Sequence, residues 1–342
     1  MIELKSDRVV VSFPDVGRKA ILSIDFQRTL RIPDDGKDYP LPPGLGSFPL
    51  RHIDEHAERV PAPWLKRGGV LLPMYQSEAL WLNFHSQHVP DRETSYPFAV
   101  KVATGKINAA TGESWHEGLS RNPQNYLVIP TQPWLDGYCV EKGIIRQFVA
   151  MPLGEGYTVE EQLTDESEVG GVQIEVFPMK KAAFDRRFPK VSRLRYGHHE
   201  GMAYCGLAAP MSQMGLAPGG RMRQEIYEDP YSIHDWDTDQ RSRCFVHLVN
   251  SVDWWQLSGE QPPSKPLSAK EYTASGHPWF DYYDADAKAL EGAPALAGIK
   301  SVAATAKEKR DTSLPDNQSI PNPKIVNLRA GLRKGQVREG AF

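Results

Sequence analysis

The sequence has few cysteines, no long apolar run and no strong excess of charge of either sign. Its cysteines, Cys139, Cys205 and Cys244, are far apart and include no CxxC pair, which argues against a disulfide framework or a zinc ribbon. No run approaches the ~18 apolar residues of a membrane span, and the charged N-terminal residues do not resemble a signal peptide. A formal net charge of −3 gives no reason to expect a nucleic-acid or membrane partner. We therefore expect a cytoplasmic protein.

The 28 prolines separate short apolar segments and leave little room for long helices. Residues 14–17 are typical of a turn between two antiparallel strands, and Thr158 and Ser268 each begin a capping box that predicts a short helix. Apolar or alternating segments predict strands at residues 8–13, 20–30, 69–72, 79–84, 98–102, 126–129, 144–151 and 172–177. We predict an α+β protein dominated by antiparallel sheet, arranged as a sandwich or a partly open barrel, with a few short helices and a C-terminal helix.

Composition divides the chain into four parts. Residues 1–260 form a β-rich body, with a division into two subdomains near residues 150–180 as one option. Residues 261–284 form an aromatic and proline-rich docking arm, residues 285–310 the C-terminal helix, and residues 311–342 a flexible basic tail. Eight basic against four acidic residues make residues 301–342 about +4. The tail is expected either to dock on an acidic face of its own body, a second copy or another protein, by strand addition or as an amphipathic turn, or to remain a solvated tail.

Aromatic side chains are concentrated in residues 253–284. Large aromatic side chains on an irregular segment have to pack against something, which is either the body of the same chain or a partner. The candidate binding residues are Trp254, Trp255, Trp279, Phe280, Tyr282 and Tyr283. Packing within the chain and exposure to a ligand are the two alternatives.

Glycine spacing suggests one anion site. Residues 215–222 have the glycine spacing of a phosphate-binding loop, but Arg221 and Met222 replace the lysine and the hydroxyl residue that such a loop needs. This argues against a nucleotide site and leaves a weaker hypothesis. Backbone amides of Gly219 and Gly220, beside Arg221 and Arg223, would bind an anion, unless the glycines form a plain turn.

Acidic and histidine residues suggest a metal site only weakly. Asp235 and Asp237 lie in an acidic loop that lacks the EF-hand pattern, and such residues also make turns without any ion. His199 and His247 would join them only if the fold brought all four together. No cofactor is predicted. If these four residues did bind an ion, it would be a divalent metal.

No GxSxG, HExxH or GxGxxG motif occurs, so no reaction can be read from the sequence. The first hypothesis is a non-catalytic binding or assembly protein that uses its aromatic and proline-rich surfaces. The alternatives are a metal-dependent hydrolase with a site built from distant His and Asp residues, and a carbohydrate-binding protein that uses Trp254, Trp255 and Trp279.

Overall fold

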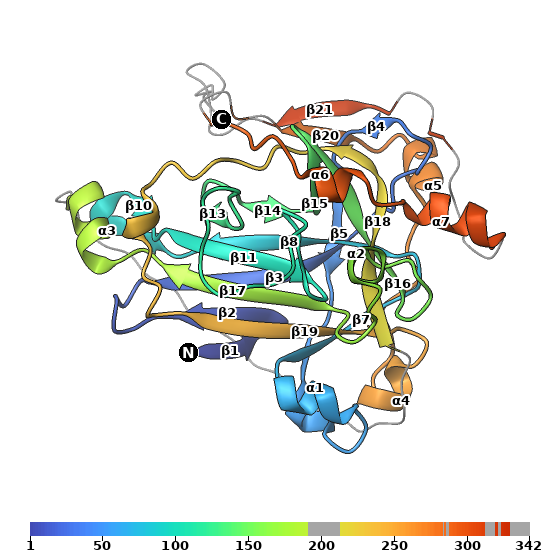
Figure 1. Ribbon diagram of the computed structural model, residues 1–342, viewed down its shortest axis with the longest axis horizontal. Coiled ribbons are helices and arrows are strands. Elements are labelled where there is room, and N and C mark those ends of the chain that lie inside the picture. The colour runs from blue at the N-terminus through green and yellow to red at the C-terminus, as the bar shows by residue number, and fades with distance from the viewer. Residues whose placement is uncertain (191–212, 283, 285–286, 312–318, 321–322, 329–342) are drawn as a thin grey trace, which may run out of the picture.

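The protein is built mainly from strands, as the computed structural model in Figure 1 shows. The structure describes residues 1–190, 213–282, 284, 287–311, 319–320 and 323–328. Its strands are β1 (Ile2–Lys5), β2 (Arg8–Ser12), β3 (Ile21–Thr29), β4 (Asp38–Tyr39), β5 (Gly44–Ser47), β6 (Arg51–His52), β7 (Val70–Met74), β8 (Ala79–Ser86), β9 (His88–Val89), β10 (Thr94–Ser95), β11 (Phe98–Thr104), β12 (Ile107–Asn108), β13 (Leu127–Ile129), β14 (Trp134–Leu135), β15 (Gly137–Glu141), β16 (Ile144–Pro152), β17 (Val172–Pro178), β18 (Gln213–Arg223), β19 (Ser242–Asn250), β20 (Trp279–Tyr282) and β21 (Ile325–Leu328). Each predicted strand segment corresponds to one of these strands.

Most strands belong to one open, largely antiparallel sheet. One part of this sheet runs through β1, β2, β3, β8, β16 and β18, and a second part runs through β13, β11, β17, β19 and β7. The two parts meet where β18 pairs with β19. The sheet does not close into a barrel. The predicted α+β class with a predominantly antiparallel sheet is confirmed.

The main hydrophobic core contains side chains from both parts of the sheet. Leu22, Ile24 and Phe26 alternate along β3 and are fully buried, together with Phe98 and Val100 of β11. Burial of such side chains contributes about 1.5–3 kcal/mol each and is the main force that holds the strands together. A division into two subdomains was considered near residues 150–180. Strands on either side of this region belong to the same sheet, since β16 pairs with β8 and β17 pairs with β11.

The helices are short. They are α1 (Ala62–Arg67), α2 (Val159–Thr164), α3 (Lys181–Arg187), α4 (Trp254–Ser258), α5 (Ala269–Ala274), α6 (Pro294–Ala297) and α7 (Val302–Lys309), with 3₁₀ turns η1 (Ile53–His56), η2 (Pro90–Arg92) and η3 (Ile233–Asp235). Both predicted capping boxes form, with the Thr158 and Ser268 hydroxyls accepting hydrogen bonds from the amides of Glu161 and Glu271. In the part of the chain that the structure describes, no helix has the length and apolar character needed to span a bilayer.

The C-terminal helix expected within residues 285–310 is present as α7 and is shorter than that segment. The described residues of this segment contain two short helices, α6 and α7, separated by residues 298–301. Ser301 accepts a hydrogen bond from the Ala304 amide and so begins α7 as a separate helix.

The aromatic arm and part of the tail pack on the body. The amide of Leu41 donates to the Phe280 carbonyl at 2.7 Å, and the Phe280 amide donates back to Leu41 at 2.9 Å. Strand β21 of the tail adds to β20 in parallel, with Ile325 opposite Trp279 and Leu328 opposite Tyr282. In Figure 1 these two strands lie together at the top, close to β4 and β18. For residues 325–328 the structure therefore shows strand addition to the chain's own aromatic arm.

Candidate functional site

A cavity of about 370 Å³ lies where the arm meets the body, and we call it the aromatic pocket. Its lining is mostly apolar, with one carboxyl group. The lining residues are Leu41, Pro42, Pro43, Gly44, Trp81, Trp134, Asp136, Phe280 and Leu328. Small-molecule sites typically have this combination of volume, aromatic walls and few polar groups.

Two paired strands position the tryptophans of the pocket. Strand β14 pairs with β8, and the rings of Trp81 and Trp134 meet edge to face, with centroids 6.4 Å apart and an interplanar angle of 76°. Leu80 and Leu82 are buried in the core, so the alternation of β8 places Trp81 on the opposite face. Tyr282 of the arm also packs against Trp134 edge to face, with centroids 4.9 Å apart. Strand pairing and these ring contacts therefore hold the two indole rings nearly perpendicular to each other.

The proline-rich segment and the arm complete the walls. Residues 41–43 carry apolar side chains, and the paired backbone hydrogen bonds between Leu41 and Phe280 fix the arm against them. Leu328 enters from β21 and is 41% exposed, so it lies at the edge of the cavity. Five separate parts of the chain therefore build this one site.

Asp136 is the charged group of the pocket, and it is almost fully buried. It lies between β14 and β15, where its amide donates to Gln224 Oε1 at 3.1 Å. Gln224 Nε2 donates in return to Asp136 Oδ2 at 2.5 Å. Among the described residues, Gln224 is the one side chain that donates a hydrogen bond to this carboxyl group. Burial raises the pKa of Asp136 to about 7, and the hydrogen bond from Gln224 opposes this only in part. A carboxyl group that titrates near neutrality, in a cavity, marks a candidate site.

The aromatic residues singled out from the sequence divide into two groups. Phe280 lines the pocket and Tyr282 supports Trp134. Trp254 is fully buried in a separate cluster with Trp64 of α1, and the neighbouring Trp255 is 52% exposed. Tyr283 lies outside the described residues.

The expected carbohydrate platform of Trp254, Trp255 and Trp279 does not form in the structure. Trp279 is fully buried, and its Nε1 donates to Thr273 Oγ1 at 3.1 Å. Because Trp254 is also buried and belongs to another cluster, the three rings do not share an exposed surface. Their burial reflects the packing of the arm and of α4 on the body.

The glycines of the proposed anion site lie inside β18 and not in a turn. A Cβ atom at Gly220 would stand 2.3 Å from the Pro33 carbonyl oxygen, and one at Gly219 would stand 2.6 Å from a methyl carbon of Val149. Close packing therefore explains these two glycines.

The two arginines of that proposed site already have acidic partners. Arg221 pairs with Asp38 at 2.7 Å and with Glu141 at 2.6 Å, and Arg223 pairs with Asp281 at 2.9 Å. Carboxylates of the chain itself thus occupy the positions that an anion would take.

The metal candidates have separate surroundings. Asp235 binds the guanidinium groups of Arg186 and Arg187, whereas His247 stacks on Trp64, with ring centroids 4.6 Å apart. Asp237 accepts hydrogen bonds from two backbone amides of its own loop. His199 lies outside the described residues. Among the residues that are described, no three His, Cys, Asp or Glu side chains are grouped so as to hold a metal ion.

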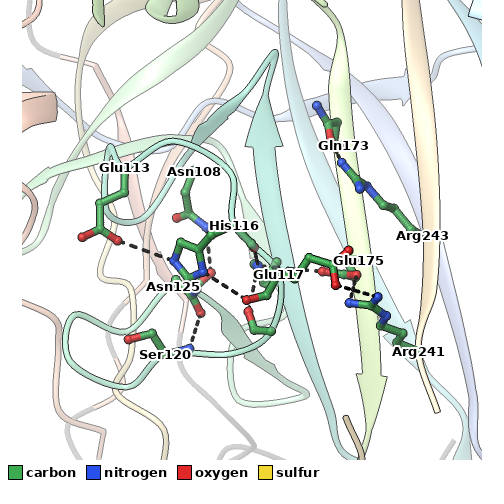
Figure 2. A network of polar contacts seen from close by, with 12 residues as sticks. Asn108, Glu113, His116, Glu117, Ser120, Asn125, Gln173, Glu175, Arg241 and Arg243 are labelled. Carbon is green, nitrogen blue, oxygen red and sulfur yellow. Dashed lines mark hydrogen bonds and ion pairs between the residues drawn. The ribbon is translucent and has the colours of Figure 1, made fainter. Parts of the chain in front are cut away.

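A charged network on three neighbouring strands is the other concentration of polar side chains (Figure 2). Lys101 of β11, Glu175 of β17 and Arg243 of β19 lie side by side through strand register. The fully buried Lys101 ammonium donates to the carbonyls of His116 and Gly118, at 2.5 and 2.8 Å, and lies 3.8 Å from Glu175. Burial lowers the pKa of Lys101 and raises that of Glu175.

The charged groups of this network pair with one another. Arg241 bridges Glu117 and Glu175, as Figure 2 shows, and Arg243 lies over the Trp115 ring at 4.6 Å. The network thereby fastens residues 115–118 to the sheet. We assign it a structural role, since its charges are used within the chain.

Comparisons with protein-family models, with curated proteins and with solved structures find no match to this chain. The functional argument therefore rests on the geometry of the aromatic pocket. Trp81, Trp134 and Asp136 were not singled out in the sequence, because no spacing pattern connects them with residues 41–44, 280 and 328.

Proposed function

We propose that this chain is a binding protein whose ligand is a small, largely apolar molecule held in the aromatic pocket. The carrying observation is the cavity itself, with a volume of about 370 Å³ and walls of two tryptophans, a phenylalanine and two prolines. Contacts with rigid aromatic side chains contribute to the binding free energy, and little side-chain entropy is lost when the ligand binds. This agrees with the hypothesis of a binding protein with aromatic and proline-rich surfaces.

The metal-dependent hydrolase has less support, because the described residues contain no group of potential metal ligands. Metal analysis of the purified protein tests this alternative directly. Stoichiometric zinc, manganese or iron would favour the hydrolase.

Leu328 offers a way to block the pocket without disturbing the core. It lies at the edge of the pocket and is 41% exposed, so Leu328→Trp should fill part of the cavity. Ile325 is equally exposed on the same strand but does not line the pocket, which makes Ile325→Trp the matched control.

The experiment is a thermal-shift screen of small aromatic and alicyclic compounds against the full chain, followed by calorimetric titration. Compounds that stabilise the wild type should bind Ile325→Trp equally well and Leu328→Trp about tenfold or more weakly. Equal binding to all three proteins, or no binding to any, would refute the proposal.

A further inference from the structure

Asp136 has fewer partners than two comparably buried carboxylates of this chain, Glu78 and Asp229. Glu78, equally buried, receives two hydrogen bonds from the Arg28 guanidinium and one from the Tyr75 amide. Asp229 receives hydrogen bonds from Tyr126, Trp236 and a backbone amide. Asp136 receives one side-chain hydrogen bond, from Gln224, and no ion pair with any described residue.

Asp136, which has no ion-pair partner among the described residues, also lines the aromatic pocket. A buried carboxylate without a compensating cation or several donors costs free energy, so proteins normally pair it. Asp136 is also the acidic residue among those that line the cavity. A cation that entered the pocket would therefore meet an uncompensated carboxylate.

The walls of the pocket suit the same charge. Trp81 and Trp134 stand nearly perpendicular to each other, and Phe280 adds a third ring. Faces of aromatic rings attract cations, most strongly those of tryptophan and most strongly when water is excluded. Rings and a carboxylate around one cavity are the features that recognise alkylated ammonium groups.

We propose that the ligand of the aromatic pocket is a small organic cation, an amine or quaternary ammonium compound with an apolar body, and that Asp136 is its counter-ion. This inference rests on the proposed function, since it names the class of ligand for the same site. The apolar body contacts the prolines, Phe280 and Leu328, while the ammonium group lies near Asp136.

Calorimetric titration at pH 8 with two pairs of probes tests the charge requirement. Choline is compared with 3,3-dimethylbutan-1-ol, and phenyltrimethylammonium with tert-butylbenzene, because each neutral compound replaces nitrogen by carbon at nearly constant shape. Wild-type protein should bind each ammonium compound about tenfold or more tightly than its neutral analogue. Asp136→Asn should abolish this preference. Asp239→Asn, which removes the same charge from an exposed loop residue, should keep it.

The outcomes separate this inference from the proposed function. Equal affinity for charged and neutral analogues in the wild type, or an unchanged preference in Asp136→Asn, would overturn the cation assignment. Binding of neutral compounds alone, with loss in Leu328→Trp, would also overturn it while leaving the apolar pocket function intact. If no probe and no screened compound binds, both proposals are wrong.

Discussion

Replacement of Asp136 by asparagine should remove a pH dependence of stability that the pocket creates. The substitution keeps the shape of the side chain, and the asparagine oxygen can still accept from Gln224 Nε2. It removes only the negative charge, which pairs with no cationic side chain among the residues that the structure describes. We expect Asp136→Asn to be more stable than the wild type at pH 8 in the absence of ligand.

The magnitude follows from the two pKa values of Asp136. In the folded protein burial raises the pKa to about 7, whereas an unfolded aspartate titrates near 3.9. Between these values the folded state keeps a proton that the unfolded state has lost, so stability falls as the pH rises and is constant above about pH 7. At 1.36 kcal/mol per pKa unit the full effect is about 4 kcal/mol, of which about 3 kcal/mol falls between pH 5 and pH 8.

Urea unfolding of wild type and Asp136→Asn at pH 5, 6, 7 and 8 measures this directly, because the difference between the two proteins cancels most other titrating groups. The advantage of the variant should grow by about 3 kcal/mol from pH 5 to pH 8. Asp239→Asn should show no such trend. A constant difference between wild type and Asp136→Asn across this range would show that Asp136 is already ionised at pH 5, and the argument for an uncompensated carboxylate would fail.

Three further predictions concern other parts of the fold. Burial lowers the pKa of His247 to about 4, below its unfolded value near 6.5, so stability should fall by about 3 kcal/mol as the pH drops from 6.5 to 4. Urea unfolding of His247→Gln should lack this loss, and an equal acid loss in both proteins would contradict it. Lys101→Met should cost about 3–5 kcal/mol in urea unfolding, because it removes one of the two cations that pair with the buried Glu175 and the donor to the carbonyls of His116 and Gly118. Lys101→Met with Glu175→Met should cost clearly less, and equal costs would refute the pairing. Thr158→Ala should lose about 1 kcal/mol by calorimetry through the broken capping box, unlike Thr158→Ser, which keeps the hydroxyl.

The sequence by itself determined many of the strands and the capped helices of this fold. Alternation of apolar and polar residues predicted strands such as β3 and β8, because side chains on a strand alternate between core and solvent. The capping boxes at Thr158 and Ser268 were predictable because they involve residues only three positions apart. Such local interactions form wherever the chain carries the residues for them.

Tertiary structure decided which distant residues meet. Gly219 and Gly220 suggested a turn, but both lie in strand β18. Glycine is needed at these positions because Val149 and Pro33 approach too closely for a side chain. Lys101 and Glu175 became neighbours through strand register, which the sequence pattern does not specify.

The aromatic pocket depends most completely on the tertiary structure. Trp81, Asp136 and Phe280 lie in three parts of the chain, and packing of the arm against the proline-rich segment brings them to one cavity. Their side chains have ordinary structural uses when considered one at a time. The buried carboxyl group of Asp136 becomes a candidate binding group only because the fold places it in one cavity with aromatic rings, with no cation beside it among the described residues.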